Sequence, residues 1–340
     1  MKIRDDIMLY GKLAQQKLGY VAGQVEVTSD CLQHCKYCQS WRDKSYIKRF
    51  TLEQLRDFVQ DLREYFSMFE HLTLTGGDPQ AWPYLDEFLD WWDIPSALDN
   101  VDLQVSTALA RDVEDPNLWR SAIKDLRVSI DSANEKIYQE IRGDKKNNFG
   151  TVLERLITLR HPNLAVITTM YPDNIGELLP LLLTLDNLYR KGLPLRKIMV
   201  MAGIGVELDN EFWSRWRYTK QWANDTLQTS TSFADDIPTA RAVCNSPEIN
   251  KVKCWASKLG FHVKPNGDIY PCCLVGGEAA EVQKEFKMGN IFEQGLVDIY
   301  NSYTPTRYGM KPICREICQF KQLQINLAGD LAEKVRLAIP

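Results

Sequence analysis

Apolar and polar residues between positions 20 and 205 follow two periods in turn. Runs with an apolar residue at every second position are typical of strands, and runs with apolar residues every three or four positions are typical of helices. Thr51 stands three residues before Gln54, a capping-box pattern that marks the start of a helix. The predicted strands are 24–28, 71–75, 101–106, 126–130, 164–170 and 197–201. The predicted helices are 51–66, 84–92, 149–160 and 175–190.

Six strands separated by helices predict an α/β fold with a parallel sheet, because each parallel step needs a crossover connection. Right-handed crossovers would wrap this sheet into an open or closed β/α barrel. In full barrels the catalytic groups lie at the carboxyl ends of the strands. A cysteine loop follows 24–28 and a Gly-Gly-Asp-Pro turn follows 71–75, so both motifs fall at such ends.

Charge and cysteine content narrow the class of protein. The 340-residue chain has a formal net charge of −4, which gives no general attraction to nucleic acid or to an anionic membrane. No apolar segment typical of a signal peptide precedes Cys31. The longest apolar stretch, 178–185, contains a proline and is far too short to span a bilayer. Nine cysteines without an export signal indicate metal ligation in a reducing compartment, so we expect a cytoplasmic location.

The cysteine loop carries the strongest chemical signal. Cys31, Cys35 and Cys38 form the pattern C-x3-C-x2-C. Three thiolates in one loop suit a cubic iron–sulfur cluster, which wants four ligands, so one iron would stay open for a ligand that is not protein. The alternative is a zinc site, which closes with four protein ligands. Nothing near the loop supplies an obvious fourth ligand, and His34 is badly placed to share the metal.

This loop resembles that of the radical S-adenosylmethionine (SAM) enzymes, including the aromatic Tyr37 before the third cysteine. A second resemblance is the turn Gly76-Gly77-Asp78-Pro79, which is similar to the family's Gly-Gly-Glu-Pro turn. In the family this turn receives the amino group of SAM. Asp78 is one methylene shorter than the usual Glu, so we expect the contact to rest mainly on backbone atoms. As structure alone, the same four residues make an ordinary turn.

A third stretch resembles the Ser-x-Asp-Gly, Arg-Gly and Phe motifs of the SPASM branch of this family: Val128-Ser129-Ile130-Asp131-Ser132, Ile141-Arg142-Gly143 and Phe149. Ser132 stands where Gly is usual. The resemblance implies that Ser129 and Arg142 meet the ribose and the carboxylate of SAM, since the planar fork of Arg suits a carboxylate. Ser106 is a second candidate for the ribose. The alternative is a strand-end serine and a surface arginine.

The C-terminal third holds further cysteines around a predicted hairpin. Residues 261–271 contain two short strands around an Asn266-Gly267 turn. The segment resembles SPASM and twitch extensions, which hold auxiliary iron–sulfur clusters. The resemblance implies one auxiliary [4Fe-4S] cluster, and a zinc ribbon is the alternative. The implied ligands are Cys254, Cys272, Cys314 and Cys318.

Two cysteines of this region are left over. Adjacent residues of an extended segment point apart, so Cys273 is not expected to share a cluster with Cys272. In sulfatase-maturing members an Asp in the place of Cys273 acts as a base, and its absence puts that chemistry in doubt. Cys244 is expected to be a buried, small apolar residue.

The resemblance implies a domain organisation: an N-terminal segment 1–20, a partial (β/α)6 radical SAM barrel 21–205, a bridging segment 206–250, a small α+β SPASM/twitch-like cluster domain 251–320 and a tail 321–340. The implied cofactors are a SAM-binding [4Fe-4S] cluster, one auxiliary [4Fe-4S] cluster and SAM. An external electron donor such as flavodoxin or ferredoxin is implied as a partner.

The activity implied is reductive cleavage of SAM, followed by hydrogen abstraction by the 5′-deoxyadenosyl radical. We expect oxidative modification of a peptide or protein. Only 30 residues precede Cys31, so leader recognition is expected from a separate protein. One alternative is dehydrogenation or rearrangement of a small polar metabolite such as a sugar, cyclitol or nucleotide. An alternative of another class is a non-enzymatic iron–sulfur or zinc-binding protein.

Overall fold

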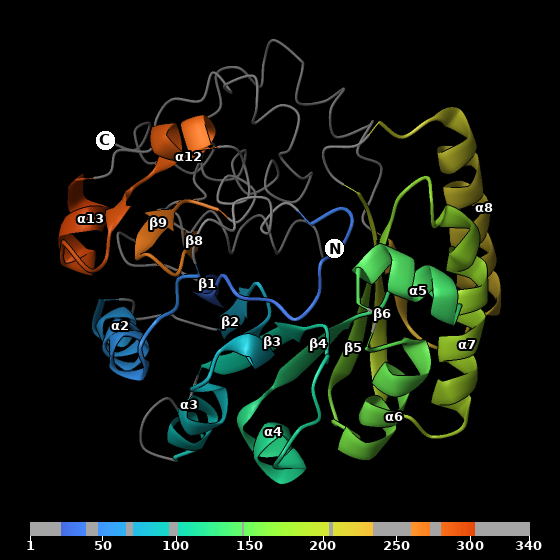
Figure 1. Cartoon of the computed structure of the whole chain (residues 1–340), viewed down its shortest axis with the longest axis horizontal. Coiled ribbons are helices and arrows are strands. Elements are labelled where there is room, and N and C mark those ends of the chain that lie inside the picture. The colour runs from blue at the N-terminus through green and yellow to red at the C-terminus, as the bar shows by residue number, and fades with distance from the viewer. Residues whose placement is uncertain are drawn as a thin grey trace, which may run out of the picture. The chain divides into compact units, whose positions relative to one another are not determined.

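The structure is a computed structural model that describes residues 22–38, 47–65, 71–94, 101–144, 146–203, 207–233, 260–272 and 280–302 (Figure 1). These residues divide between two compact units. The described part of the first unit is 22–26, 50–65, 71–72, 260–272 and 280–302. The rest of the described residues, from Val27 onward, belong to the second unit.

The six predicted strands are all present, with bounds that differ by up to two residues. They are β1 (Ala22–Thr28), β2 (His71–Gly76), β3 (Asp102–Thr107), β4 (Asp125–Ser129), β5 (Leu164–Met170) and β6 (Leu195–Ala202). A short strand that the pattern did not predict, β7 (Thr231–Phe233), follows. In the second unit the strands lie in the order β2-β3-β4-β5-β6-β7. From β3 to β7 every neighbouring pair is parallel, as expected for an open, partial β/α barrel.

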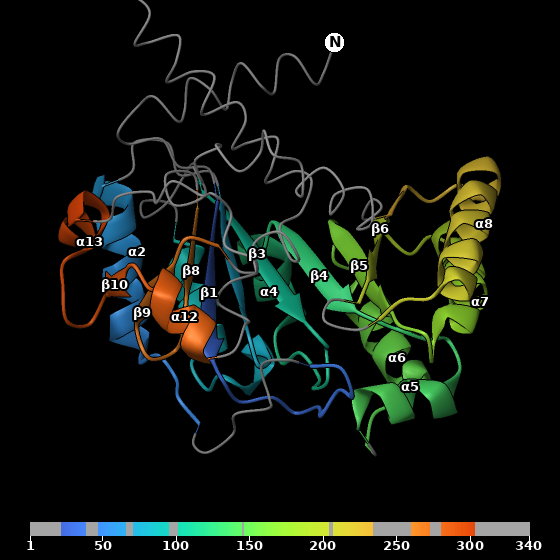
Figure 2. The same ribbon diagram turned by 90° about the horizontal axis from the view of Figure 1, so that it is seen from above.

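The helices of the second unit follow the strands in alternation. Those expected from the pattern are α3 (Leu85–Trp92), α6 (Phe149–Leu159) and the pair η2 (Ile175–Glu177) and α7 (Leu178–Arg190), which together replace one predicted helix. The pattern did not predict η1 (Pro79–Ala81), α4 (Pro116–Ala122) or α5 (Glu135–Arg142), and it gave no bounds for α8 (Asn210–Thr226). Figure 1 shows α3, α4, α6 and α7 along one side of the strands, and Figure 2 shows the same strands from above.

The two faces of these strands differ in chemistry. On one face lie fully buried apolar side chains such as Val105, Val128, Val166 and Ile198. The opposite face, which we call the inner face, is half-buried and mostly polar or sulfur-containing. Register places its side chains next to one another in the pairs Ser106 with Arg127, Ser129 with Ile167, Ile167 with Met199, and Thr169 with Met201. The apolar face supplies the core, so the inner face is free to carry chemistry.

The first unit is built around a predicted hairpin. The beginning of β1 pairs in parallel with β8 (Gly260–Val263), β8 pairs antiparallel with β9 (Asp268–Tyr270), and β9 with β10 (Gly289–Asn290). Gly267 in the turn has a φ of +84°, which a residue without Cβ adopts easily. The side chain of Asn290 donates to the carbonyl of Asn266, which fixes the turn. The hairpin prediction is therefore confirmed.

The described part of the first unit also contains three helices: α2 (Leu52–Tyr65), α12 (Ala280–Phe286) and α13 (Leu296–Ser302). The capping box predicted for α2 is confirmed. The backbone N–H of Thr51 donates to the Gln54 side chain at 2.9 Å, and the backbone N–H of Gln54 donates to Thr51 Oγ1 at 3.1 Å. Among the described helices, none combines the length and the apolar composition that crossing a membrane requires.

Candidate cluster and SAM site

The cysteine loop lies where β1 ends, in the second unit. Cys31, Cys35 and Cys38 are reduced and half-buried. Burial raises the pKa of the Cys31 thiol to about 12, and the Asp78 carboxylate adds to the rise. No three described His, Cys, Asp or Glu side chains meet in a geometry suited to a single metal ion. A cubic cluster does not need such convergence, because each thiolate binds a different iron.

The turn after β2 packs directly against the start of this loop. The backbone N–H of Gly77 donates to the carbonyl of Thr28 at 2.7 Å, and that of Asp78 donates to the carbonyl of Asp30 at 2.8 Å. A Cβ on Gly77 would lie 2.0 Å from the Asp30 oxygen. Position 77 therefore accepts only glycine if the turn is to keep this contact. Gly76 has a φ of +136°, which turns the chain away from β2.

The other side of the loop is held by the end of α5. The backbone N–H groups of His34 and Lys36 donate to the carbonyls of Arg142 and Ile141 at 2.9 and 2.8 Å. These are carbonyls of the last helical turn, which have no partner inside a helix. Gly143 ends the helix with a φ of +58°, and a Cβ there would lie 2.3 Å from the His34 carbonyl oxygen. The loop is thus fixed by backbone contacts on two sides.

Arg142 lies beside the second cysteine. Its Nη2 forms an ion pair with Asp131 Oδ2 at 2.8 Å, and its Nη1 donates to Cys35 Sγ at 3.7 Å. Its guanidinium lies 5.9 Å from the centre of the Tyr138 ring. Burial acts to lower the pKa of Arg142, but the negative charges of Asp131 and Cys35 outweigh it and the pKa is raised. The surface-arginine alternative is wrong, since Arg142 is 7% exposed.

Tyr37 stacks on a second tyrosine. Its ring lies 3.6 Å, between centroids, from that of Tyr171, with an angle of 11° between the planes. Tyr171 follows β5, and Gly203 after β6 makes room for its ring, because a Cβ on Gly203 would lie 2.1 Å from it. Asp173 forms an ion pair with Lys36. The aromatic residue of the motif therefore closes the loop against the ends of β5 and β6.

Asp78 is buried, and its carboxylate accepts hydrogen bonds from neighbouring protein groups. Oδ1 accepts from Thr107 Oγ1 at 2.7 Å and from the backbone N–H of Gln80 at 3.0 Å, and Oδ2 accepts from the backbone N–H of Ala108 at 2.9 Å. Burial raises the pKa of Asp78, and these hydrogen bonds oppose the rise. The carboxylate thus joins the turn after β2 to the end of β3.

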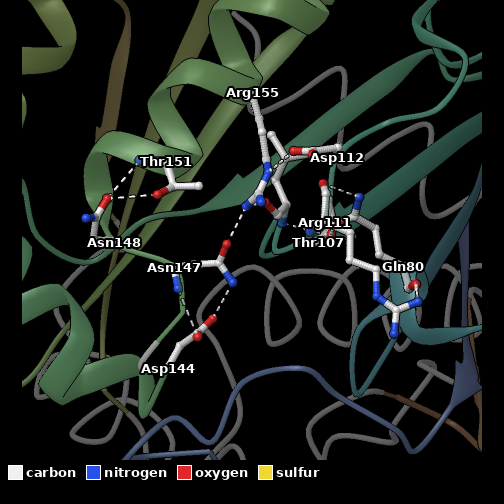
Figure 3. A network of polar contacts seen from close by, with 10 residues as sticks. Gln80, Thr107, Arg111, Asp112, Asp144, Asn147, Asn148, Thr151 and Arg155 are labelled. Atoms are coloured by element: carbon white, nitrogen blue, oxygen red, sulfur yellow. Dashed lines mark hydrogen bonds and ion pairs between the residues drawn. The ribbon is translucent and has the colours of Figure 1, made fainter.

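A polar network extends from this point to α6 (Figure 3). Gln80 exchanges hydrogen bonds with the backbone of Arg111. Arg155 contacts Asp112 at 2.7 Å, Asn147 Oδ1 at 2.6 Å and the carbonyl of Leu109, a residue with a φ of +51°. These contacts fix the loops after β3 and α5. Sequence reasoning did not find this network, because its members lie on η1, on α6 and on the loops after β3 and α5, far apart in the chain.

The two serine candidates lie on the inner face. Ser129 is the last residue of β4, and Ser106 lies one residue before the end of β3. Both are half-buried, and neither side chain donates to or accepts from another residue in the part of the chain that the structure describes. Their hydroxyls are therefore available to a ligand on that face.

Of the auxiliary-cluster candidates, the structure describes Cys272, which is half-buried just beyond β9. The candidates Cys254, Cys314 and Cys318 lie outside the described residues, as do Cys244 and Cys273.

The residues of the second unit fit the implied SAM-binding [4Fe-4S] cluster and SAM. The unit offers three thiols on a loop fixed by backbone contacts, and the buried Nε of Arg142 has no partner among the described residues.

Comparison with known proteins identifies two domains in the chain. The model of the radical SAM superfamily matches residues 25–185, and that of an iron–sulfur cluster-binding domain, SPASM, matches residues 254–330. The chain belongs to the radical SAM superfamily. It is an enzyme of the branch in which a SPASM domain follows the barrel. The radical SAM domain implies SAM and a [4Fe-4S] cluster, and the SPASM domain implies auxiliary iron–sulfur binding.

Similar structures include the crystal structure of Streptococcus suis SuiB bound to S-adenosylmethionine. It is 13% identical, with a TM-score of 0.66 over 92% of this chain and 74% of SuiB. The structure of anSMEcpe with bound AdoMet is 14% identical, with a TM-score of 0.57 over 92% of this chain and 94% of that one. A GTP 3′,8-cyclase of Crocosphaera subtropica is 30% identical over 131 residues, 37% of this chain and 38% of the cyclase.

Replacing Asp78 tests whether its carboxylate supports the turn or binds SAM. We expect Asp78→Ala to lower the free energy of unfolding by about 3 kcal/mol, because two buried N–H groups lose their acceptor at about 1–3 kcal/mol each. SAM affinity should fall by less than about tenfold, or ~1.4 kcal/mol. Urea unfolding and equilibrium SAM binding measure the two effects. Asp112→Ala, at an exposed carboxylate, is the control. Unchanged stability with lost SAM binding would place the carboxylate on SAM instead.

Proposed function

We propose that this enzyme abstracts a hydrogen atom from a peptide or protein and leaves it oxidised. The observation that carries the proposal is the loop of three cysteines, fixed by the Gly77 turn and by the end of α5. This loop would supply three ligands to a [4Fe-4S] cluster, which would leave one iron without a protein ligand and open to SAM. When bound, the cluster and SAM together supply a carbon radical that takes hydrogen from an unactivated carbon.

The residues proposed to bind SAM lie around this loop. Backbone groups of Gly76, Gly77 and Pro79 would receive the methionine amino group, since Asp78 is occupied in holding the turn. The Ser106 and Ser129 hydroxyls on the inner face would contact the ribose. The unpartnered Nε of Arg142 would donate to the SAM carboxylate. Tyr37, stacked on Tyr171, would shield the site from water.

A peptide or protein substrate is supported by two structural relatives. One solved structure of SuiB is bound to the precursor peptide SuiA, and one of anSMEcpe is bound to AdoMet and the Cp18Cys peptide. Both share the fold of this chain at low sequence identity, with TM-scores of 0.64 and 0.54. A separate peptide-recognition protein is part of the proposal.

The net reaction needs an electron acceptor and an electron donor. One auxiliary [4Fe-4S] cluster would take the electron left on the substrate, and its proposed ligands are Cys254, Cys272, Cys314 and Cys318. A cluster with four protein ligands has no open iron, so electron transfer is the role that fits it. A flavodoxin or ferredoxin of the cytoplasm would reduce the SAM-binding cluster.

A small polar metabolite is the second candidate substrate. The match to a GTP 3′,8-cyclase, an enzyme named for a nucleotide, favours it. The half-buried inner face carries hydroxyls and cations, including Ser106, Ser129 and Arg127, that suit such a molecule. The two candidates share the same radical chemistry and differ in what occupies the inner face.

Deuterium transfer separates the two candidates. The loaded enzyme, reduced with dithionite, is incubated with SAM and either deuterated peptides or deuterated sugars, cyclitols and nucleotides. We expect deuterium in 5′-deoxyadenosine only from a peptide, because the radical takes its hydrogen directly from the substrate carbon. Mass spectrometry of 5′-deoxyadenosine measures the label.

Label arriving from a sugar, cyclitol or nucleotide would overturn the peptide proposal in favour of the second candidate. The variant with Cys254, Cys272, Cys314 and Cys318 all replaced by Ala tests the oxidative step. It should still transfer deuterium but form no oxidised product. Circular dichroism must show that it stays folded, because bound metal contributes to folding free energy. Oxidised product from this variant would contradict the electron-acceptor role.

A further inference from the structure

We propose that Arg142, held by Asp131, is a positioning residue that raises the reduction potential of the SAM-binding cluster through its contact with Cys35. This role goes beyond contact with SAM and holds for either class of substrate. It rests on the arrangement of charges within the second unit.

The guanidinium of Arg142 has one end on a cluster ligand and the other on a carboxylate. Nη1 lies 3.7 Å from Cys35 Sγ, and Nη2 lies 2.8 Å from Asp131 Oδ2. The planar fork of Arg makes both contacts at once, which the single ammonium of a Lys does not. The side chains of Arg142 and Asp131 are each 9% exposed, so solvent screens their charges little.

Asp131 is itself fixed from two sides. Its Oδ1 accepts from the backbone N–H of Thr169 at 2.8 Å, and its carbonyl accepts from the side chain of Asn174 at 3.3 Å. Asn174 also donates to the carbonyl of Thr169 at 3.0 Å. The ion pair is therefore anchored to β5 and to the loop that follows it.

The helix that carries Arg142 is fixed relative to the cysteine loop. Asn134 caps the start of α5 by accepting from the backbone N–H groups of Lys136 and Ile137. At the other end, Ile141 and Arg142 accept the two backbone hydrogen bonds from the loop. The backbone of Arg142 is thus tied to the loop that carries Cys35, and its guanidinium is tied to Asp131, so we expect the contact with Cys35 to persist when the thiolate binds iron.

The sign of the effect follows from charge. Reduction adds one negative charge to the cluster, and a nearby cation favours the reduced form. Hydrogen bonds to the sulfurs and local charge are the means by which proteins set cluster potentials. Asp131 opposes the effect because its negative charge lies on the far side of the same guanidinium. Removing the cation should lower the potential, and removing the anion should raise it.

The experiment is a redox titration of the anaerobically loaded, full-length protein without SAM, followed by electron paramagnetic resonance. We expect Arg142→Gln to disfavour reduction by about tenfold in equilibrium constant, or about 59 mV for a one-electron couple. Arg142→Lys should lower the potential by less. Asp131→Asn, which keeps an acceptor for the Thr169 N–H, should raise it. Arg49→Gln is the matched control, because Arg49 forms an exposed pair with Asp30 beside Cys31.

Opposite shifts in the Arg142 and Asp131 variants, with Arg49→Gln unchanged, support the proposal. A purely structural pair would lower thermal stability in both variants and leave both potentials at the control value. Shifts of the same sign, or none beyond the control, would overturn the proposal. If Arg142→Gln fails to hold iron, the comparison of Arg142→Lys with Asp131→Asn decides by the same criterion of opposite signs.

Discussion

Replacing Cys31, Cys35 and Cys38 together by Ala is expected to remove about half of the iron and all SAM cleavage, since each cubic cluster holds about four irons. Without the three thiolates, the loop between the Gly77 turn and α5 has no ligand for the cluster that binds SAM. Iron analysis of the anaerobically reconstituted protein measures the first effect. Formation of 5′-deoxyadenosine with dithionite and SAM measures the second.

The reciprocal variant is the control for this result. Replacing Cys254, Cys272, Cys314 and Cys318 should remove the other half of the iron and leave SAM cleavage in place. The two variants thus show which cluster is needed for SAM cleavage as well as how the iron divides between the two clusters. Persistent SAM cleavage in the first variant, or stoichiometric zinc in place of iron in the unmodified protein, would contradict the assignment.

Gly77→Ala is expected to have the second-largest effect. The new Cβ would lie 2.0 Å from the Asp30 carbonyl oxygen, which is backbone and cannot swing aside. The turn after β2 must then move away from the cysteine loop. Such overpacking costs about 1–3 kcal/mol in stability. We expect loss of SAM binding of more than about tenfold as well, because the proposed backbone contacts to SAM move with the turn.

Gly176→Ala is the matched control for this substitution. Gly176 lies in η2 of the same unit, and a Cβ there would contact only the far end of the Arg215 side chain, at 3.5 Å. Thermal unfolding and SAM binding of the two variants are compared directly. Equal, small effects at both positions would show that the Gly77 contact does not position the turn.

The barrel strands could be predicted from sequence because their apolar period is strong. Buried residues alternate with half-buried ones from Val166 to Met170 in β5 and from Ile198 to Ala202 in β6. The helices α4 and α5 were missed because seven or eight residues give only two turns of periodicity. Their caps were the available signal: Asp115 before Pro116, and Asn134, each accept from the first backbone N–H groups of the helix.

The cysteine loop could be located from its spacing, because the chemistry needs three thiolates close together in the chain, and the neighbouring turn could be located from its resemblance to the family's motif. The side-chain contacts that hold the loop and the turn in place could not be predicted from the sequence. Asp131 was noted within a motif, but its ion pair with Arg142 depends on how α5 returns to the loop. The stacking of Tyr37 on Tyr171 joins residues 134 positions apart in the chain and has no local pattern. Burial of Asp78 likewise depends on its partners at the end of β3.

The difference between the two faces of the second unit has a consequence for directed evolution. Mutations at Val105, Val128 or Val166 would act mainly on folding, because these side chains are fully buried under the helices. Mutations at Thr169, Met199 or Met201 would change the inner face, on which we propose that the substrate binds, while the helix-facing core keeps its packing. A library confined to such inner-face positions could therefore search for new substrates with few variants lost to misfolding.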